Sequence, residues 1–169
     1  MPVQIDASDL QKLDVFLGEV DKRLSNLTPF WNDYAAPLVQ GELSEIFLTE
    51  GRGEWADLHP DYAARKEQSH PGKTILRRDD HYITAATSTS HPANIFETTV
   101  TEMVYGIDGD WFDSRFSYDY PSAHELGLGV PQRQVWGKLT ETGELDANIA
   151  RLGEKWQREE IAEVERAFF

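Results

Sequence analysis

The chain contains no cysteine among its 169 residues. Disulfide bridges, thiolate metal sites and cysteine nucleophiles are therefore excluded, and this composition fits a reducing compartment. Long apolar runs are missing as well, because no stretch approaches the ~20 residues that a membrane-spanning helix needs. The first residues show no basic segment followed by an apolar one, so we expect no secretory signal and no membrane partner.

Positive charge is also scarce. The sequence has 16 Lys and Arg residues against 30 Asp and Glu residues, which gives a formal net charge of −14 with the histidines neutral. A surface with this balance repels phosphates over most of its area. The charge therefore argues against a protein that holds nucleic acid by general electrostatics.

Several motifs that mark enzymes are absent from the sequence. It has no Gly-x-Gly-x-x-Gly pattern and no Gly-Lys-Ser/Thr loop, whose backbone amides cradle phosphates. It also has no Gly-x-Ser-x-Gly turn of the kind that exposes a serine nucleophile. We therefore expect no cofactor, no metal ion and no catalytic residue.

The sequence can nevertheless build a core, because 40% of its residues are hydrophobic and 11% are aromatic. The length suits one domain, residues 1–169, with a helical segment at 1–42 and an α+β core at 43–169. A second helix is expected from Thr28, and Pro37 should break or kink it because proline lacks an amide hydrogen. The first helix carries an apolar stripe at three- and four-residue spacings: Leu10, Leu13, Leu17, Val20, Leu24 and Leu27.

A small antiparallel sheet is expected in the middle of the chain. Residues that favour strands cluster at 95–100 and 103–107, which predicts a hairpin, and 130–136 is a candidate third strand. The segment 144–168 predicts a long closing helix with one apolar stripe: Leu145, Ile149, Leu152 and Trp156. The predicted fold is α+β, with N-terminal helices and the sheet (hairpin plus third strand) packed against the C-terminal helix.

Some residues could carry metal or acid–base chemistry. His59, His70, His81 and His91 recur at spacings of 11, 11 and 10 residues, which match no zinc-ligand pattern. The segment 108–119 is rich in aspartate and predicts an exposed loop, but it lacks the glutamate that completes a calcium loop. These patterns do not define a metal site, but the residue types leave one alternative function open. It is a small metal-dependent hydrolase that uses His124, Glu125 and the three aspartates Asp108, Asp110 and Asp113.

Two other features favour contacts between proteins. Five of the 16 basic residues fall in a 14-residue window: Arg65, Lys66, Lys73, Arg77 and Arg78. They form either solvated helix faces or a patch that complements an acidic neighbour, including another copy of this chain. The chain also has five tryptophans, a residue enriched at protein–protein hot spots. A third class, an acidic mimic of DNA, would need its acids along one face, whereas these are spread over the whole chain.

Four pieces of the sequence then follow one another in a recognisable order. The first holds Phe-Leu-Thr-Glu-Gly and Glu-Trp-Ala-Asp-Leu within 47–58 and continues through 62–66. The second is Tyr-Pro-Ser-Ala-His-Glu-Leu-Gly at 120–127, the third is Val-Pro-Gln-Arg-Gln-Val-Trp-Gly at 130–137, and the fourth is the closing helix. Together they resemble the phage virion morphogenesis or tail-completion family of Mu-like tailed phages, over roughly residues 43–168.

This resemblance implies a structural virion protein, and no enzyme, at the head–tail junction of a tailed phage or prophage. Such a neck or tail-completion (terminator) component joins or completes the tail, and it is assembled in the host cytoplasm. The implied partners are other copies in a ring, with a hexamer expected, and adjacent neck, portal-adaptor or tail-tube proteins. DNA is expected to pass through the ring without specific binding.

The resemblance also assigns residues to the family motif: Trp55, Leu58, Tyr62, Lys66, Tyr120, His124, Gly127, Pro131, Arg133 and Trp136. The patch expected to face a partner comprises Arg65, Lys73, Arg77 and Arg78. Where the family usually has glutamine after the histidine, this chain has Glu125, and Leu76 is not followed by the usual glycine.

Several of these residues have a physical role that the sequence suggests. We expect Trp55 and Trp136 to be core anchors, and Gly127 to shape a turn because glycine adopts positive φ freely. We also expect Arg133 to pair with an acid on its own chain or on a neighbour's. For His124 we expect a hydrogen bond to a turn carbonyl.

Overall fold

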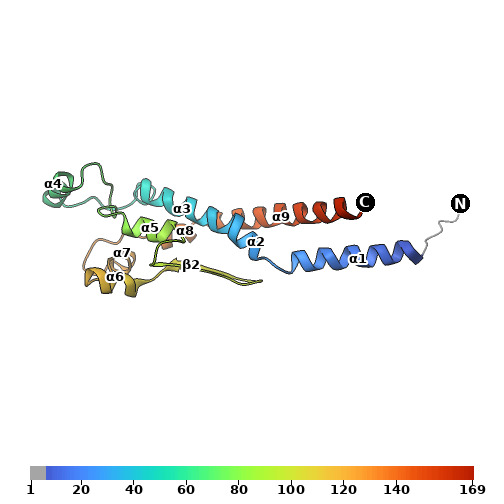
Figure 1. Ribbon diagram of the computed structural model, residues 1–169. Helices are drawn as coiled ribbons and strands as arrows, with labels where there is room; N and C mark the ends of the chain where they lie inside the picture. The colour runs from blue at the N-terminus through green and yellow to red at the C-terminus, as the bar shows by residue number, and fades with distance from the viewer. Residues whose placement is uncertain (1–6) are drawn as a thin grey trace.

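The longest element of the chain is its closing helix, α9, which spans Glu144–Phe168 as the apolar stripe predicts. A computed structural model of the protein describes residues 7–169. Leu145, Trp156 and Val164 are the buried residues of α9. The first half of the helix packs against the broader part of the molecule, residues 36–143, which forms the head of this protein (Figure 1). Its second half runs outward as one side of a two-helix stalk (Figure 1).

The other side of the stalk is α1, which spans Ala7–Leu24. It lies antiparallel to the outer half of α9 (Figure 1). The Phe16 ring meets the Phe168 ring edge-on, with centroids 6.0 Å apart. Nearer the head, the Arg23 guanidinium lies 2.9 Å from Glu160 and 3.2 Å from Glu163. The two helices are therefore joined by an aromatic contact at one end and ion pairs at the other.

The next helical segment is continuous where Pro37 predicts a break. It comprises α2 (Thr28–Phe30), the π-helical turn η1 (Trp31–Ala35) and α3 (Ala36–Leu48). In η1 the hydrogen bonds reach one residue further than in an α-helix, and the Ala36 amide donates to the Trp31 carbonyl. This wider turn, immediately before Pro37, accommodates a residue that cannot donate to the preceding turn.

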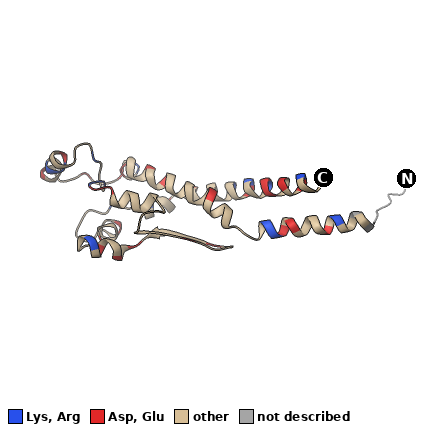
Figure 2. Cartoon of the chain, viewed as in Figure 1, with Lys and Arg blue, Asp and Glu red and all other residues tan. Residues whose placement is uncertain are grey.

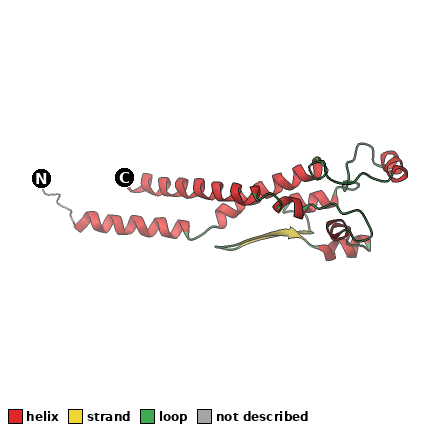
Figure 3. Cartoon of the chain, turned by 180° about the vertical axis from the view of Figure 1, so that it is seen from behind, coloured by secondary structure: helices red, strands yellow, loops and turns green. Residues whose placement is uncertain are grey.

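The sheet has two strands in the described residues, β1 (Asn94–Thr98) and β2 (Met103–Ile107). They form the predicted antiparallel hairpin, in which Asn94 pairs with Ile107 and Thr98 with Met103. The hairpin packs mainly on α5 (His81–Thr87), and Met103 also meets the Trp156 cluster of α9. Figure 3 shows the strands as a small part of a mostly helical α+β molecule.

The predicted third strand at 130–136 is wrong. The segment is irregular and leads into a short helix, α8 (Trp136–Thr140). Its backbone amides find partners outside any sheet: Arg133 donates to the His124 carbonyl, and Val135 donates to the Glu125 carboxylate. Pro131 has no amide to offer.

The aspartate-rich segment is also not a loop. It contains α6 (Gly109–Phe116), and the Asp108 side chain caps this helix by accepting a hydrogen bond from the Asp110 amide at 3.0 Å. The buried side of α6 carries Phe112, which is fully buried in the main core. The polar residues of this segment occupy the outer face of an amphipathic helix.

The remaining helices complete the head of the molecule: α4 (Pro60–Ser69) and α7 (Tyr120–Leu126). The core of the head is built from fully buried side chains of α3, α5 and α6, including Leu43, Phe47 and Tyr82. A second cluster, formed by Phe30, Ala35 and Trp156, joins the head to the stalk. No described helix combines the length and apolar character that crossing a membrane requires.

Candidate functional site

Two segments far apart in the sequence meet at one cleft of about 540 Å³. One segment is the loop before α4 together with α4, and the other is α7 with the irregular stretch after it. Of the ten motif residues, seven line this cleft: Leu58, Tyr62, Lys66, Tyr120, His124, Pro131 and Arg133. The cleft is therefore the place where the structure brings most of the predicted residues together.

Arg133 ties the two segments to each other. Its side chain is 3% exposed. Nε and Nη2 donate to the Ala56 carbonyl at 3.1 and 2.8 Å, and Nη2 also donates to the Asp57 carbonyl at 3.3 Å. Burial lowers the pKa of Arg133, while Glu50 and Tyr62 oppose that effect. The carboxylate expected as its partner is absent among the described residues, and backbone carbonyls take its place.

Lys66 is the second buried cation of the cleft, at 6% exposure. It comes from the middle of α4, and its Nζ donates to the Thr74 carbonyl. Burial lowers the pKa of Lys66; nearby Glu50 opposes this effect, and the positive charge of Arg133 adds to it. The two cations are thus close enough to repel each other.

Trp55 and Trp136 are motif residues that do not line the cleft. Trp55 is 7% exposed and belongs to the main core. Its indole Nε1 donates to the Gln134 carbonyl at 3.0 Å, which adds another link between the two segments. The ring lies over Gly51, where a Cβ atom would come within 2.3 Å of it. Trp136 is half-buried and contacts the Tyr105 ring, with centroids 6.5 Å apart.

The histidine of the motif faces a turn. His124 Nδ1 lies 3.4 Å from the Pro131 carbonyl oxygen, in agreement with the hydrogen bond expected from the sequence. Burial lowers the pKa of His124, an effect that the Pro131 carbonyl opposes. Gly127 ends α7 with a φ of +72°, and its hydrogen faces Gln132, so it shapes the same turn.

Glu125, which stands where the family usually has glutamine, anchors the next helix. Its Oε2 accepts from the amides of Val135 and Trp136 at 2.8 and 3.3 Å, and Oε1 accepts from Gly137 at 2.7 Å. A carboxylate at the start of a helix satisfies amides that have no intrahelical partner. The side chain therefore has a structural position, at the start of α8.

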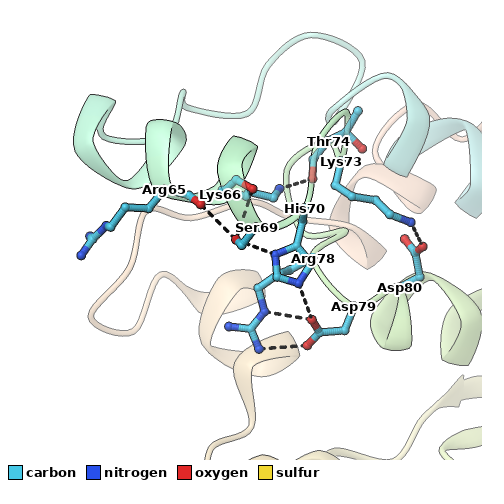
Figure 4. A network of polar contacts seen from close by, with 9 residues as sticks. All are labelled: Arg65, Lys66, Ser69, His70, Lys73, Thr74, Arg78, Asp79 and Asp80. Carbon is cyan, nitrogen blue, oxygen red and sulfur yellow. Dashed lines mark hydrogen bonds and ion pairs between the residues drawn. The ribbon is translucent and has the colours of Figure 1, made fainter.

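Two residues of the basic window, Lys66 and Arg78, line the cleft, and Figure 4 shows the local contacts of every window residue except Arg77. Arg78 forms a two-pronged pair with Asp79 at 2.9 Å, and Lys73 pairs with Asp80. Arg77 also reaches Asp80, at 3.0 Å. Of the four residues proposed to face a partner, three are therefore paired to aspartates of the same segment. The fourth, Arg65, donates to the Asp61 carbonyl and makes no ion pair among the described residues.

The residues of the hydrolase alternative are not assembled into a ligand set. In the described part of the chain, no group of three or more His, Asp or Glu side chains is arranged to hold a metal ion. Asp108 caps α6, while Glu125 binds the start of α8. His81 and His91 do meet, with ring centroids 6.0 Å apart, but they pack among aromatic rings.

Other residues of the cleft are not among the motif residues that the sequence indicates. Phe116 and Tyr118 come from the end of α6 and the residues after it, and Ile75 and Val130 complete the apolar wall. The Tyr118 hydroxyl donates to the Leu128 carbonyl at 3.2 Å. A usable signal was the aromatic spacing of Phe112, Phe116 and Tyr120, whose rings contact one another.

Comparisons with known proteins give no relative: no family model, no curated protein and no solved structure matches the chain.

Proposed function

We propose that this protein is a structural component of a phage virion, placed at the head–tail junction and built into a ring of its own copies. The proposal begins from the order of the motif blocks. It is supported by their arrangement in space, because residues from the first three blocks meet at one cleft. Arg133 and Trp55 join the first and third blocks through side-chain hydrogen bonds to backbone carbonyls, and the Arg133 amide donates to the His124 carbonyl of the second. The blocks thus form one connected unit.

The observation that carries the proposal is an excess of surface. The chain exposes 10664 Å², whereas a compact monomer of 19.3 kDa exposes about 8,500 Å². Giving the six residues outside the described range the full exposure of an unfolded chain, about 1,000 Å², still leaves roughly 1,200 Å². A standard protein interface covers about 800 Å² on each partner. The surplus is therefore enough for a specific contact with at least one neighbour.

Helix α1 of the stalk (Figure 1) carries exposed apolar side chains. On α1, Leu10, Leu13 and Leu17 are 56%, 47% and 54% exposed, although their spacing of three and four residues is that of a coiled-coil seam. The same stripe continues into Val20 and Leu24, which are partly buried. The outer part of the stripe is thus an apolar seam that no helix covers within residues 7–169. In the proposed ring, a different face of the next copy covers this seam, because a ring joins two unlike faces of neighbouring copies.

Charge fits a conduit for DNA. Figure 2 shows acidic and basic residues interspersed along both stalk helices, and the whole chain carries a formal charge of −14. An acidic inner wall repels phosphates and lets DNA pass without adhering. The mixed charges on the stalk suit contacts between copies, because opposite charges on neighbouring helices attract.

Deleting the gene and imaging the particles tests this function. Without a protein that joins the two halves of the virion, filled heads and finished tails accumulate separately. Normal joined particles in the deletion strain contradict the proposal. Empty heads in place of filled ones contradict the junction and point to an earlier step in assembly.

A further inference from the structure

The cleft has an electrostatic property that its structural bonds do not explain. Two cationic side chains, Lys66 and Arg133, are more than nine-tenths buried in its wall. Neither forms an ion pair with any described residue, and both donate to backbone carbonyls only. Burying a charge without a counter-ion is costly, so proteins seldom retain two such charges together.

The acids around the cleft form no ion pair with either cation among the described residues. Glu50 is one negative charge that acts on both cations, but it forms no ion pair with either among the described residues, and its Oε1 accepts from the Ile75 amide at 2.8 Å. One carboxylate can offset at most one of the two positive charges. Asp79 lines the cleft but is held by Arg78. Asp57 also lines the cleft, as an exposed side chain without an ion pair among the described residues.

Both cations retain donors that can bind a ligand. The guanidinium of Arg133 uses Nε and Nη2 for its carbonyl bonds, and Nη1 makes no hydrogen bond within the described part of the chain. Nη1 is not among the fully buried atoms without a partner, so it retains access to solvent. Lys66 uses one bond, to Thr74, although an ammonium group has three N–H donors.

The rest of the wall is apolar or aromatic. Leu58, Ile75, Phe116 and Val130 line it, with Tyr62 and Tyr118 exposed at 41% and 46%. Burial raises the pKa of Tyr120 to about 12, so this phenol stays neutral. The cleft volume of about 540 Å³ lies within the range of ligand sites. The complementary ligand is thus a carboxylate attached to apolar groups.

We propose that this cleft is a docking site for an acidic peptide segment of a partner protein, whose Asp or Glu carboxylate meets Lys66 and Arg133 while neighbouring apolar side chains fill the aromatic wall. The choice of a protein partner rests on the assembly role proposed above. An incoming carboxylate relieves the repulsion between the two cations and gains charge-assisted hydrogen bonds.

The peptides Ac-Phe-Glu-Phe-NH2 and Ac-Phe-Gln-Phe-NH2 test the proposal, because they differ only in the carboxylate. Titration of each into the full-length protein, followed by calorimetry and by NMR of the cleft tyrosines, should show the Glu peptide binding at least about tenfold tighter. Lys66→Met, which keeps an apolar stem, should abolish that preference. Lys155→Met, on the exposed face of α9, is the matched control and should leave it unchanged.

A second variant keeps the proposal testable if Lys66→Met does not fold. Tyr62→Ala removes one exposed aromatic side chain from the wall of the cleft. This side chain makes no hydrogen bond among the described residues, and its loss should weaken the binding of both peptides equally. Equal binding of the two peptides to the wild-type protein, or no binding at the cleft, overturns the proposal. Tighter binding of free N-acetylphenylalanine than of the Glu peptide overturns it in favour of a small-molecule acid. These titrations use the isolated protein, so they can fail while the deletion experiment still places the protein at the junction.

Discussion

The Glu125 carboxylate accepts a hydrogen bond from the Gly137 amide, twelve residues later, at 2.7 Å. The same carboxylate binds the amides of Val135 and Trp136. This one side chain therefore fixes the path from α7 to α8, and with it the position of the segment that carries Arg133.

Replacing this carboxylate should destabilise the protein. Glu125→Ala leaves three amides without their acceptor, and we expect a loss of about 2–3 kcal/mol in the free energy of unfolding. For a domain of this size, the melting temperature should fall by about 5–10 °C. Glu125→Gln keeps one acceptor oxygen and should cost less. Glu165→Ala, an exposed acid of α9 without an ion pair among the described residues, is the control for calorimetry; equal melting temperatures of Glu125→Ala and the control would refute this role.

The burial of Phe112 distinguishes helix α6 from an exposed loop. Phe112→Ala empties a fully buried aromatic position and should cost about 3–5 kcal/mol in the free energy of unfolding. Asp113→Ala, on the exposed side of the same helix, should change it by less than about 0.5 kcal/mol. Denaturant titration measures both, and a mild effect of Phe112→Ala would mean that this segment does not pack on the core.

Stability should fall when the half-buried histidines His91 and His124 become protonated. Burial lowers the pKa of His91 and of His124 below the ordinary value near 6.5. As pH falls through that value, the unfolded chain takes up protons before the folded protein does, so the folded state loses stability. Thermal melts at pH 7.5 and 5.5 should show a lower melting temperature at pH 5.5. His124→Gln should reduce this difference, and an unchanged difference would exclude His124 as a source.

A separate loss is expected in more acidic solution. Arg78 lowers the pKa of Asp79, and Lys73 and Arg77 lower that of Asp80 against the effect of burial. These aspartates stabilise the folded state fully above about pH 4, and the contribution declines as the pH falls from there through the lower pKa of the folded state. Asp80→Asn should therefore lower stability at pH 7 and lower it by less at pH 3. Equal losses at both pH values would show that charge is not the cause.

The long elements could be predicted from the sequence because their periodicity is strong. Helix α9 spans the predicted range, and the hairpin has strands where β-forming residues cluster. The third strand failed for a local reason: residues 130–136 look extended, but Glu125 binds their amides, and a side chain acting as backbone acceptor leaves no periodic pattern. Helix α6 could not be predicted from its acids, which are typical of an exposed loop, and only the four-residue spacing of Phe112 and Phe116 indicates a helix.

The candidate site, like the fold, could be predicted from the sequence only in part. The motif blocks identified seven lining residues of the cleft, yet only the fold shows that residues of α4 and α7 face each other across it. The ion pairs of Lys73, Arg77 and Arg78 could not be predicted either. The sequence shows a basic window, but it does not indicate which aspartate each cation contacts. The role of this patch toward a partner stays a prediction.

The exposed seam of α1 provides the most direct test of the account. A deletion strain supplied with the double variant Leu13→Glu/Leu17→Glu should accumulate separate heads and tails, because charges on the seam prevent copies from joining. Leu48→Gln, which changes an equally exposed leucine of α3, should restore joined particles as the wild-type gene does. Circular dichroism of the purified variants should confirm that both are folded. Joined particles in wild-type numbers with the folded double variant would contradict assembly through α1.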